Sequence, residues 1–532
     1  MGRTKRFQGA EHTGAKPKES LGVLGLLAVI YTASISGSYG LEAAVSAGGP
    51  FLTILSLFVI PLFWGLPTAL SVAELSCAVP SNAGPTMWVN VAFNTVLTGA
   101  VTYVTLFLNF VDNSLYPTVF GDYCKTVFAL DRVETRVLKV AFIWVTAFVN
   151  LVGVEFVGRV SVFIMVATMA PFALMLMLQL PEGFDWERIS EVPKDVNWVL
   201  FLPVVCWNFS GFDSAGNITE EVRNPKRVVP KALLLLVVAG VATYVPPVIV
   251  GASVPALRGL PWSAWDNGFW VKVGHALGGW WLAHFVLIGS SISTFGMMTA
   301  MLATTSRSLA GAGQIGFFPA PISHWLAHYH HQLKTPVNAI LVNSAVTTFL
   351  CVTSEFEELV EADQILYGLR LAAIMAAFLK LRYAHPELHR PFAVPCGVLG
   401  AVVCGGVPLV FSLGLVAFSM YSSAGAAWMG CVIIGGSLAA SWLMFRVIRK
   451  DDVFHGAIVE FDEESSVSMS VSKEHVGGAD DDFAYQQARL ERLGLLQHVP
   501  TSSSSSSGGD DDAPDGAVDG YGAADPVAPT TA

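Results

Sequence analysis

Two polar interruptions divide long apolar stretches of the chain: Ser34-Ile35-Ser36-Gly37-Ser38-Tyr39-Gly40-Leu41-Glu42 and Trp207-Asn208-Phe209-Ser210-Gly211-Phe212-Asp213-Ser214-Ala215-Gly216. Each contains a Ser-Gly pair, and glycine lowers helix stability by about 1 kcal/mol, so the backbone can unwind at both places. In a membrane, unwound backbone is tolerated only where it lines a cavity. Paired interruptions predict the central site of an inverted-repeat transporter, whereas one alone would favour tight helix packing.

The composition is typical of a membrane protein. Of 532 residues, 53% are hydrophobic and 13% are charged, against about 25% charged in soluble domains. We therefore predict an all-α polytopic membrane protein in contact with the lipid bilayer. Seven cysteines without a CxxC pair favour neither a disulfide framework nor a metal site. The chain has no phosphate-binding loop, nucleophile elbow or HExxH motif, so we expect no enzyme activity, cofactor or nucleic-acid partner.

Runs of about 20 apolar residues, the length that crosses a bilayer, predict twelve transmembrane helices. Their ranges are 21–45, 51–78, 93–121, 137–156, 160–180, 196–218, 231–255, 275–306, 337–353, 358–380, 397–420 and 425–447. Loops on the N-terminal side carry 18 Lys and Arg residues and the opposite loops carry 8. The positive-inside rule therefore places both termini in the cytosol. We expect the plasma membrane, with an organelle membrane as the alternative.

The sequence divides into three regions. A basic extension at 1–20 precedes a transporter domain at 21–447, and a cytosolic tail follows at 448–532. After Lys450 the chain has 17 acidic and 3 basic residues in Ser-, Gly- and Asp-rich sequence, which favours disorder. Residues 483–497 are a candidate amphipathic helix within the tail, suited to binding a trafficking or regulatory protein.

Four acidic residues lie within predicted spans, where ionisable groups are costly and usually functional: Glu42, Glu74, Asp112 and Asp213. We predict that Asp213 and Glu42 hold a substrate ammonium group and that Asp112 also belongs to the substrate-binding site. Glu42 is also a candidate proton carrier, and Glu74 is a candidate for coupling or gating. The structural alternatives are a helix-end contact for Glu74 and a helix-to-helix contact through Asn113 for Asp112.

The remaining predicted site residues come from the interruptions, whose helix ends present free N–H and C=O groups. Backbone groups are expected from Ser36, Gly37, Ser38, Ser210 and Gly211, and cation–π walls from Tyr39, Trp207 and Phe212. Arg370, in the tenth span, is expected to pair with one of the acids or to face water, and it could repel a cationic substrate. It is also a candidate, with Glu42 and Glu74, for proton coupling or gating. The acidic residues from Glu355 to Asp363 are assigned to a solvated loop.

Nine short segments occur in a distinctive order: 48–50, 69–80 with Ala73-Glu74-Leu75 at its core, 82–84, 112–123, 207–213, 220–225, 230–233, 381–382 and 389–392. Together they resemble the amino acid–polyamine–organocation superfamily, and within it the polyamine-uptake and L-type amino-acid transporters of plants and protists. The resemblance covers about residues 20–447. It implies inverted repeats of helices 1–5 and 6–10 (a LeuT-like fold) with helices 1 and 6 broken. It also implies alternating access, with proton coupling or exchange.

The tenth span departs from the polyamine branch of this superfamily. Relatives in that branch carry a glutamate where this chain has Ile374 and a small residue where it has Arg370. Losing an acid and gaining a base removes negative charge worth roughly 3 kcal/mol per charge at about 6 Å. A neutral or monocationic amino acid thereby becomes a rival substrate.

The sequence thus predicts a secondary active transporter that takes up a cationic amine, a polyamine, by proton-coupled alternating access. The first alternative is a permease or exchanger for neutral or cationic L-amino acids. The second is a nutrient sensor that binds its ligand in the same pocket without transporting it.

Overall fold

The computed structural model of the chain describes residues 21–35, 37–79, 84–152, 159–215, 222–314, 317–330, 333, 335–386, 388, 390–422, 424–448, 458–462 and 466–470. The predicted N-terminal extension, Ser36 and the candidate helix at 483–497 lie outside these residues. The described part of the chain is almost entirely helical.

Nine helical segments among the described residues are long and apolar enough to cross a membrane. Five of them are single helices: α5 (Thr95–Phe128), α6 (Arg132–Val152), α10 (Pro225–Ser253), α12 (Trp280–Gln314) and α15 (Phe356–Ala384). The other four are composite. Glu42–Ala78 consists of α2 (Glu42–Ile60), a π-helical turn (Pro61–Gly65) and α3 (Leu66–Ala78), and Val160–Glu182 consists of α7 (Arg159–Gln179) and a 3-10 turn (Leu180–Glu182). Gly397–Ser422 consists of α16 (Gly397–Ala401), a π-helical turn (Val402–Gly406) and α17 (Val407–Ser422), and Trp428–Ile448 joins most of α18 (Ala424–Trp442) to a π-helical turn (Leu443–Ile448). Shorter helices are α1 (Val23–Ser34), α4 (Gly84–Ala92), α8 (Trp186–Ile189), α9 (Trp198–Trp207), α11 (Phe269–Gly278), α13 (Ala320–Leu326) and α14 (Val337–Thr353).

The long helices expose apolar side chains outward and bury polar ones inside. Met177 on α7, Val238 on α10, Phe349 on α14 and Val410 on α17 are each at least 65% exposed. In water such surfaces would associate, whereas in a bilayer they face lipid tails. This pattern supports the prediction of a helical, polytopic integral membrane protein.

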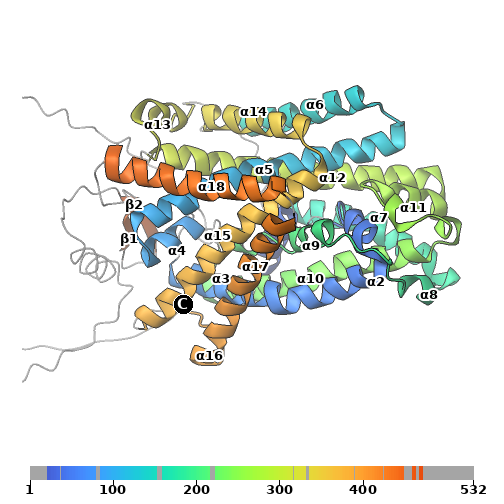
Figure 1. The fold of residues 1–532 in the computed structure, drawn as a ribbon, viewed down its shortest axis with the longest axis horizontal. Helices are drawn as coiled ribbons and strands as arrows, with labels where there is room; N and C mark the ends of the chain where they lie inside the picture. Colours follow the sequence, from blue (N-terminus) through green and yellow to red (C-terminus); the bar gives the residue numbers. More distant parts are fainter. Residues whose placement is uncertain are drawn as a thin grey trace, which may run out of the picture. The chain divides into compact units, whose positions relative to one another are not determined.

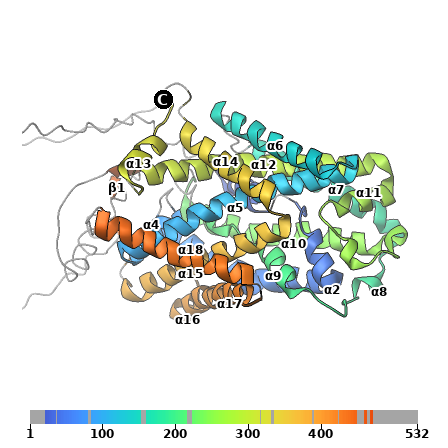
Figure 2. The same cartoon turned by 45° about the horizontal axis from the view of Figure 1, so that its top comes forward.

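The helix α5 lies at the centre of one group of helices. It packs against α12, α14, α15 and α18 (Figure 1). In a second group of helices, α10 packs against α1, α2 and α3. The helix α15 packs against both α5 and α17, as the second view shows (Figure 2). Side chains from α1, α5, α12 and α15 can therefore meet in the interior.

The two interrupted segments meet each other. The helix α1 ends at Ser34 and α9 ends at Trp207, as the Ser-Gly pairs indicate. Gly211 has φ of 88°, a left-handed conformation that favours glycine. The Ser34 hydroxyl donates a hydrogen bond to the Gly211 carbonyl at 3.2 Å. The breaks are thus in direct contact although they are far apart in the sequence.

Two short strands lie in the region that the sequence assigns to the tail. β1 (Ile458–Asp462) and β2 (Ser466–Ser470) pair in antiparallel register, which the composition did not indicate. The rest of the tail lies outside the described residues, so its disorder stays a prediction.

Candidate substrate site

A cavity of about 550 Å³ lies at the meeting point of the two helix breaks. Seven of the predicted site residues line it: Tyr39, Asp112, Trp207, Ser210, Gly211, Asp213 and Arg370. Five others are not among the described lining residues: Gly37, Ser38, Glu42, Glu74 and Phe212. The structure therefore separates the predicted residues into a group at the cavity and a group that lies elsewhere.

Asp213 and Arg370 form an ion pair in this cavity. The Asp213 side chain is 1% exposed, and Arg370 approaches its Oδ2 atom from α15. Tyr367, one turn earlier on α15, donates a hydrogen bond to Asp213 Oδ1 at 3.2 Å and accepts one from the Gly211 N–H at 3.0 Å. Of the two environments expected for Arg370, an acidic partner or water, the structure shows the acidic partner. Its charge neutralises the carboxylate predicted to hold the ammonium group.

Asp112 faces the same cavity from the middle of α5. Tyr116, one turn further on, donates a hydrogen bond to Asp112 Oδ2 at 2.8 Å. The neighbouring Asn113 instead donates to Thr305 at 2.9 Å and to Asn343 at 3.1 Å, which connects α5 to α12 and α14. Asn113 therefore makes the helix-to-helix contact considered for Asp112, and Asp112 presents its carboxylate to the cavity.

A third acid, Asp363, also lines the cavity, and its assignment to a solvated loop was wrong. Asp363 lies within α15, is 2% exposed and accepts a hydrogen bond from Gln364 Nε2 at 3.0 Å. The spacing of Asp363, Tyr367 and Arg370 corresponds to i, i+4 and i+7, which places all three on one face of a helix. That spacing is the sequence signal for this site residue, although the acidic residues nearby are typical of a solvated loop.

The aromatic residues at the cavity come from several elements. Trp207 packs edge-on against Phe356, with ring centroids 5.7 Å apart. Tyr39 packs against Phe172 with centroids 5.0 Å apart and the rings tilted by 49°, and its hydroxyl donates to the Thr168 carbonyl at 3.4 Å. Phe212, by contrast, is buried away from the cavity lining. Two of the three aromatic residues predicted for the site, Tyr39 and Trp207, therefore line the cavity.

Glu42 lies at the first residue of α2 and is fully buried. Its carboxylate accepts hydrogen bonds from the Gly40 N–H at 2.8 Å, from the Gly268 N–H at 3.1 Å and from the Tyr123 hydroxyl. Nearby, Trp270 Nε1 donates to the Ser38 carbonyl at 2.9 Å. Glu42 and Ser38 therefore connect the segment after α1 to α5 and to the start of α11, instead of facing the cavity.

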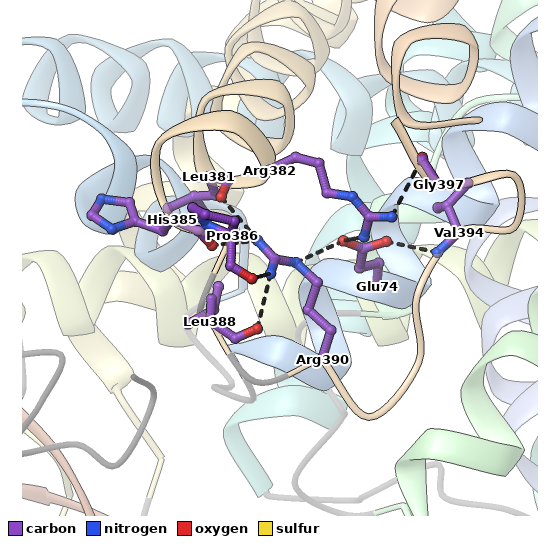
Figure 3. Close-up of polar contacts among 9 residues, drawn as sticks. All are labelled: Glu74, Leu381, Arg382, His385, Pro386, Leu388, Arg390, Val394 and Gly397. Carbon is purple, nitrogen blue, oxygen red and sulfur yellow. Dashed lines mark hydrogen bonds and ion pairs between the residues drawn. The ribbon is translucent and has the colours of Figure 1, made fainter. Parts of the chain in front are cut away.

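Glu74 binds two arginines at the far end of α3 (Figure 3). Its Oε1 atom is 2.6 Å from Arg382 Nη1 and 3.0 Å from Arg390 Nε, and its Oε2 accepts the Val394 N–H at 2.7 Å. Arg390 also donates to the Leu381 carbonyl at 2.9 Å, near the end of α15. Glu74 thus links α3 to α15 and to the loop that follows α15. It is not among the described residues that line the cavity.

Comparisons with known proteins show the family to which the chain belongs. Residues 21–445 match the model of the family described as Amino acid permease. The polyamine transporter RMV1 of Arabidopsis thaliana is 30% identical over 403 residues, which cover 75% of this chain and 80% of the relative. The polyamine transporter PUT1 of Oryza sativa subsp. japonica is 30% identical, with 78% and 77% covered. The Asc-type amino acid transporter 1 of Mus musculus is 24% identical, with 71% and 72% covered.

These relatives are transporters and not enzymes, in agreement with the prediction from motifs. The family match spans the region that carries both helix breaks, the cavity and the bonds of Glu74. It also confirms the resemblance to the amino acid–polyamine–organocation superfamily that the short segments indicated. The chain belongs to the amino acid permease family.

Proposed function

We propose that the chain is a secondary active transporter that takes up a polyamine by proton-coupled alternating access. The observation that carries this proposal is the cavity between the two helix breaks, because three carboxylates, Asp112, Asp213 and Asp363, line it. A surplus of buried carboxylates attracts cations and binds protons in their absence. The similarity to plant polyamine transporters supports the same substrate class.

The direction in which the cavity extends supports alternating access. Its lining reaches Pro85 on α4 and Arg307 and Gln314 near the end of α12, the side that the charge pattern predicts to be cytosolic. At the other end of the helices, the bonds of Glu42 to Tyr123 and Gly268 join the segments together. A transporter that works by alternating access has a conformation in which the substrate cavity is open to one side of the membrane and closed to the other.

The finer topology belongs to the same proposal. Twelve transmembrane helices in two inverted five-helix repeats would place the breaks after α1 and α9 at equivalent points. Both termini would then lie in the cytosol, and the plasma membrane is the proposed location. In this scheme Glu42 and Glu74 act on gating, since neither is among the described cavity-lining residues. The acidic tail would bind cytosolic trafficking or regulatory proteins.

An amino-acid permease or exchanger is the second candidate, and one observation favours it. The Nε atom of Arg370 is buried and has no hydrogen-bond partner among the described residues, so its N–H could donate a hydrogen bond to a substrate carboxylate. The similarity to an Asc-type amino acid transporter points the same way.

Uptake measurements distinguish these candidates. Cells that lack their own polyamine and amino-acid uptake would express the full chain and receive radiolabelled putrescine, spermidine, arginine or leucine at pH 5.5 and pH 7.5. We expect putrescine and spermidine to accumulate, faster at pH 5.5. Uptake of leucine or arginine alone would favour the second candidate, and uptake of none of the four would contradict both.

A further inference from the structure

One carboxylate in the cavity lacks a complete set of partners. Asp363 is 2% exposed and lines the cavity, yet its Oδ1 atom has no hydrogen-bond partner among the described residues. Burying a carboxylate oxygen without a partner is costly, because the lost hydration is not replaced. An unpaired buried oxygen facing a cavity therefore indicates that a ligand supplies the missing donor.

Asp112 lies close enough to Asp363 for the two carboxylates to interact electrostatically. Tyr116 donates to Asp112 Oδ2, and its hydroxyl lies within the field of both acids. Two like charges at one buried site disfavour each other's ionised form. A cation between them would remove this repulsion, so the Asp112–Asp363 pair is suited to a positively charged group.

The charge count at the site distinguishes between substrate classes. Arg370 neutralises Asp213, which leaves the Asp112–Asp363 pair as the acids that can carry up to two negative charges when a cation is bound. A zwitterionic amino acid would add no net charge and would leave that surplus buried. An amine with two ammonium groups cancels it, which is the outcome that a low-dielectric site favours.

The groups that could hold a substrate carboxylate are largely occupied. In the broken sixth span, the Gly211 N–H is bonded to Tyr367 at 3.0 Å. The Arg370 guanidinium is bonded to Asp213 through Nη2, and its buried Nε has no hydrogen-bond partner among the described residues. Because Asp213 already neutralises this guanidinium, Arg370 offers a substrate carboxylate a weaker anchor than an unpaired arginine would.

We infer that the Asp112–Asp363 pair is an ammonium subsite that makes the cavity selective for amines carrying two or more positive charges over zwitterionic amino acids. The inference rests on the proposed transport function and names the residues that set its substrate class. Asp213, held by Arg370, then positions the broken helix and does not bind the substrate cation.

The test compares putrescine, which has two ammonium groups, with n-butylamine, which has one at nearly the same length. Full-length wild type, Asp363→Asn and Asp112→Asn would be assayed for competition of each amine, and of leucine, against radiolabelled putrescine uptake. Glu357→Gln is the matched control, because Glu357 is an exposed acid in the first turn of the same helix. Binding of both amines to the purified variants provides a second readout that does not require transport.

We expect wild type to prefer putrescine over n-butylamine by tenfold or more and to ignore leucine. One charge-assisted hydrogen bond is worth about 1.5–3 kcal/mol, so each asparagine variant should lower that preference about tenfold or more. Glu357→Gln should keep it. An unchanged preference in folded Asp363→Asn, or an equal loss for both amines, would overturn the inference.

Two possible results with the wild type distinguish a failure of the subsite inference from a failure of the proposed transport function. If wild type transports leucine and not putrescine, the subsite inference fails while transport stands. If wild type transports and binds none of these compounds, the proposed function itself fails.

Discussion

Arg370 shows how one side chain changes the meaning of its neighbours. In the sequence alone, Arg370 is a lone cation in a predicted span and argues against a cationic substrate, and Asp213 is the best candidate for the ammonium ligand. The structure pairs the two, with Tyr367 bridging Asp213 to the Gly211 N–H. Because the two charges cancel, the Arg370–Asp213 pair contributes nothing to the net charge of the residues that line the cavity. At the residue scale, the negative surplus therefore comes from Asp112 and Asp363.

The ion pair predicts the effect of Asp213→Asn on stability. This change leaves the Arg370 guanidinium buried without its carboxylate, and breaking such a pair costs about 3–5 kcal/mol. We expect a clear loss of thermal stability in detergent and little uptake. Adding Arg370→Gln should restore most of the stability, because it removes the unpaired charge.

Size-exclusion chromatography of heated samples would measure this loss. The exposed Asp195→Asn serves as the control for the same chemical change. An Asp213→Asn variant as stable as wild type would show that the pair is not formed in the folded protein.

At the scale of elements, the break after α9 depends on Gly211. A Cβ atom at this position would lie 2.7 Å from the Ser34 hydroxyl oxygen, and the φ of 88° is unfavourable for other residues. The two broken segments touch here, so any added atom pushes them apart. The geometry of the cavity thus depends on a position that has no side chain.

Gly211→Ala should therefore lower the free energy of unfolding by about 1–3 kcal/mol and reduce uptake strongly. Gly414→Ala on α17 is the control, since a Cβ there meets nothing within 4 Å and alanine favours helix. Thermal denaturation and putrescine uptake of both variants would be compared. Equal uptake by Gly211→Ala and wild type would contradict the role given to the break.

The connection from α3 to α15 is the second feature at this scale. Glu74 binds Arg382, Arg390 and the Val394 N–H (Figure 3), so these segments are expected to move together. Because Glu74 is not among the described cavity-lining residues, Glu74→Gln should lower the maximal uptake rate and leave KM unchanged. Initial-rate measurements across putrescine concentrations would show the difference. A raised KM at an unchanged maximal rate would place Glu74 in substrate binding instead.

The sequence predicts some parts of this site well and others poorly. Glycine pairs and apolar runs are local signals, so the breaks near Gly37 and Gly211 and most helix positions could be predicted. Glu42 could not be placed, because its partner Gly268 is 226 residues away and the sequence alone does not show that contact. The expectation of a loop at Asp363 fails because the neighbouring acidic residues are typical of solvated loops, whereas the spacing of Asp363, Tyr367 and Arg370 is that of one helix face.

At the scale of the whole molecule, the cavity is formed within the transporter domain. Its described lining residues all lie between Val29 and Arg370, before the acidic tail begins. A transporter should therefore function without that tail, whereas a sensor would lose its output. We expect a chain ending at Lys450 to keep the KM for putrescine once uptake is corrected for the amount of protein at the cell surface. A large change in KM would show that the tail contributes to the site.

Concentrative uptake by the purified full chain tests the central claim most directly. Proteoliposomes with an acidic exterior and a neutral interior would receive radiolabelled putrescine, with and without a protonophore. We expect putrescine to accumulate above the external concentration, and the accumulation to collapse when the protonophore is added. Putrescine binding without accumulation would contradict it and would favour a sensor.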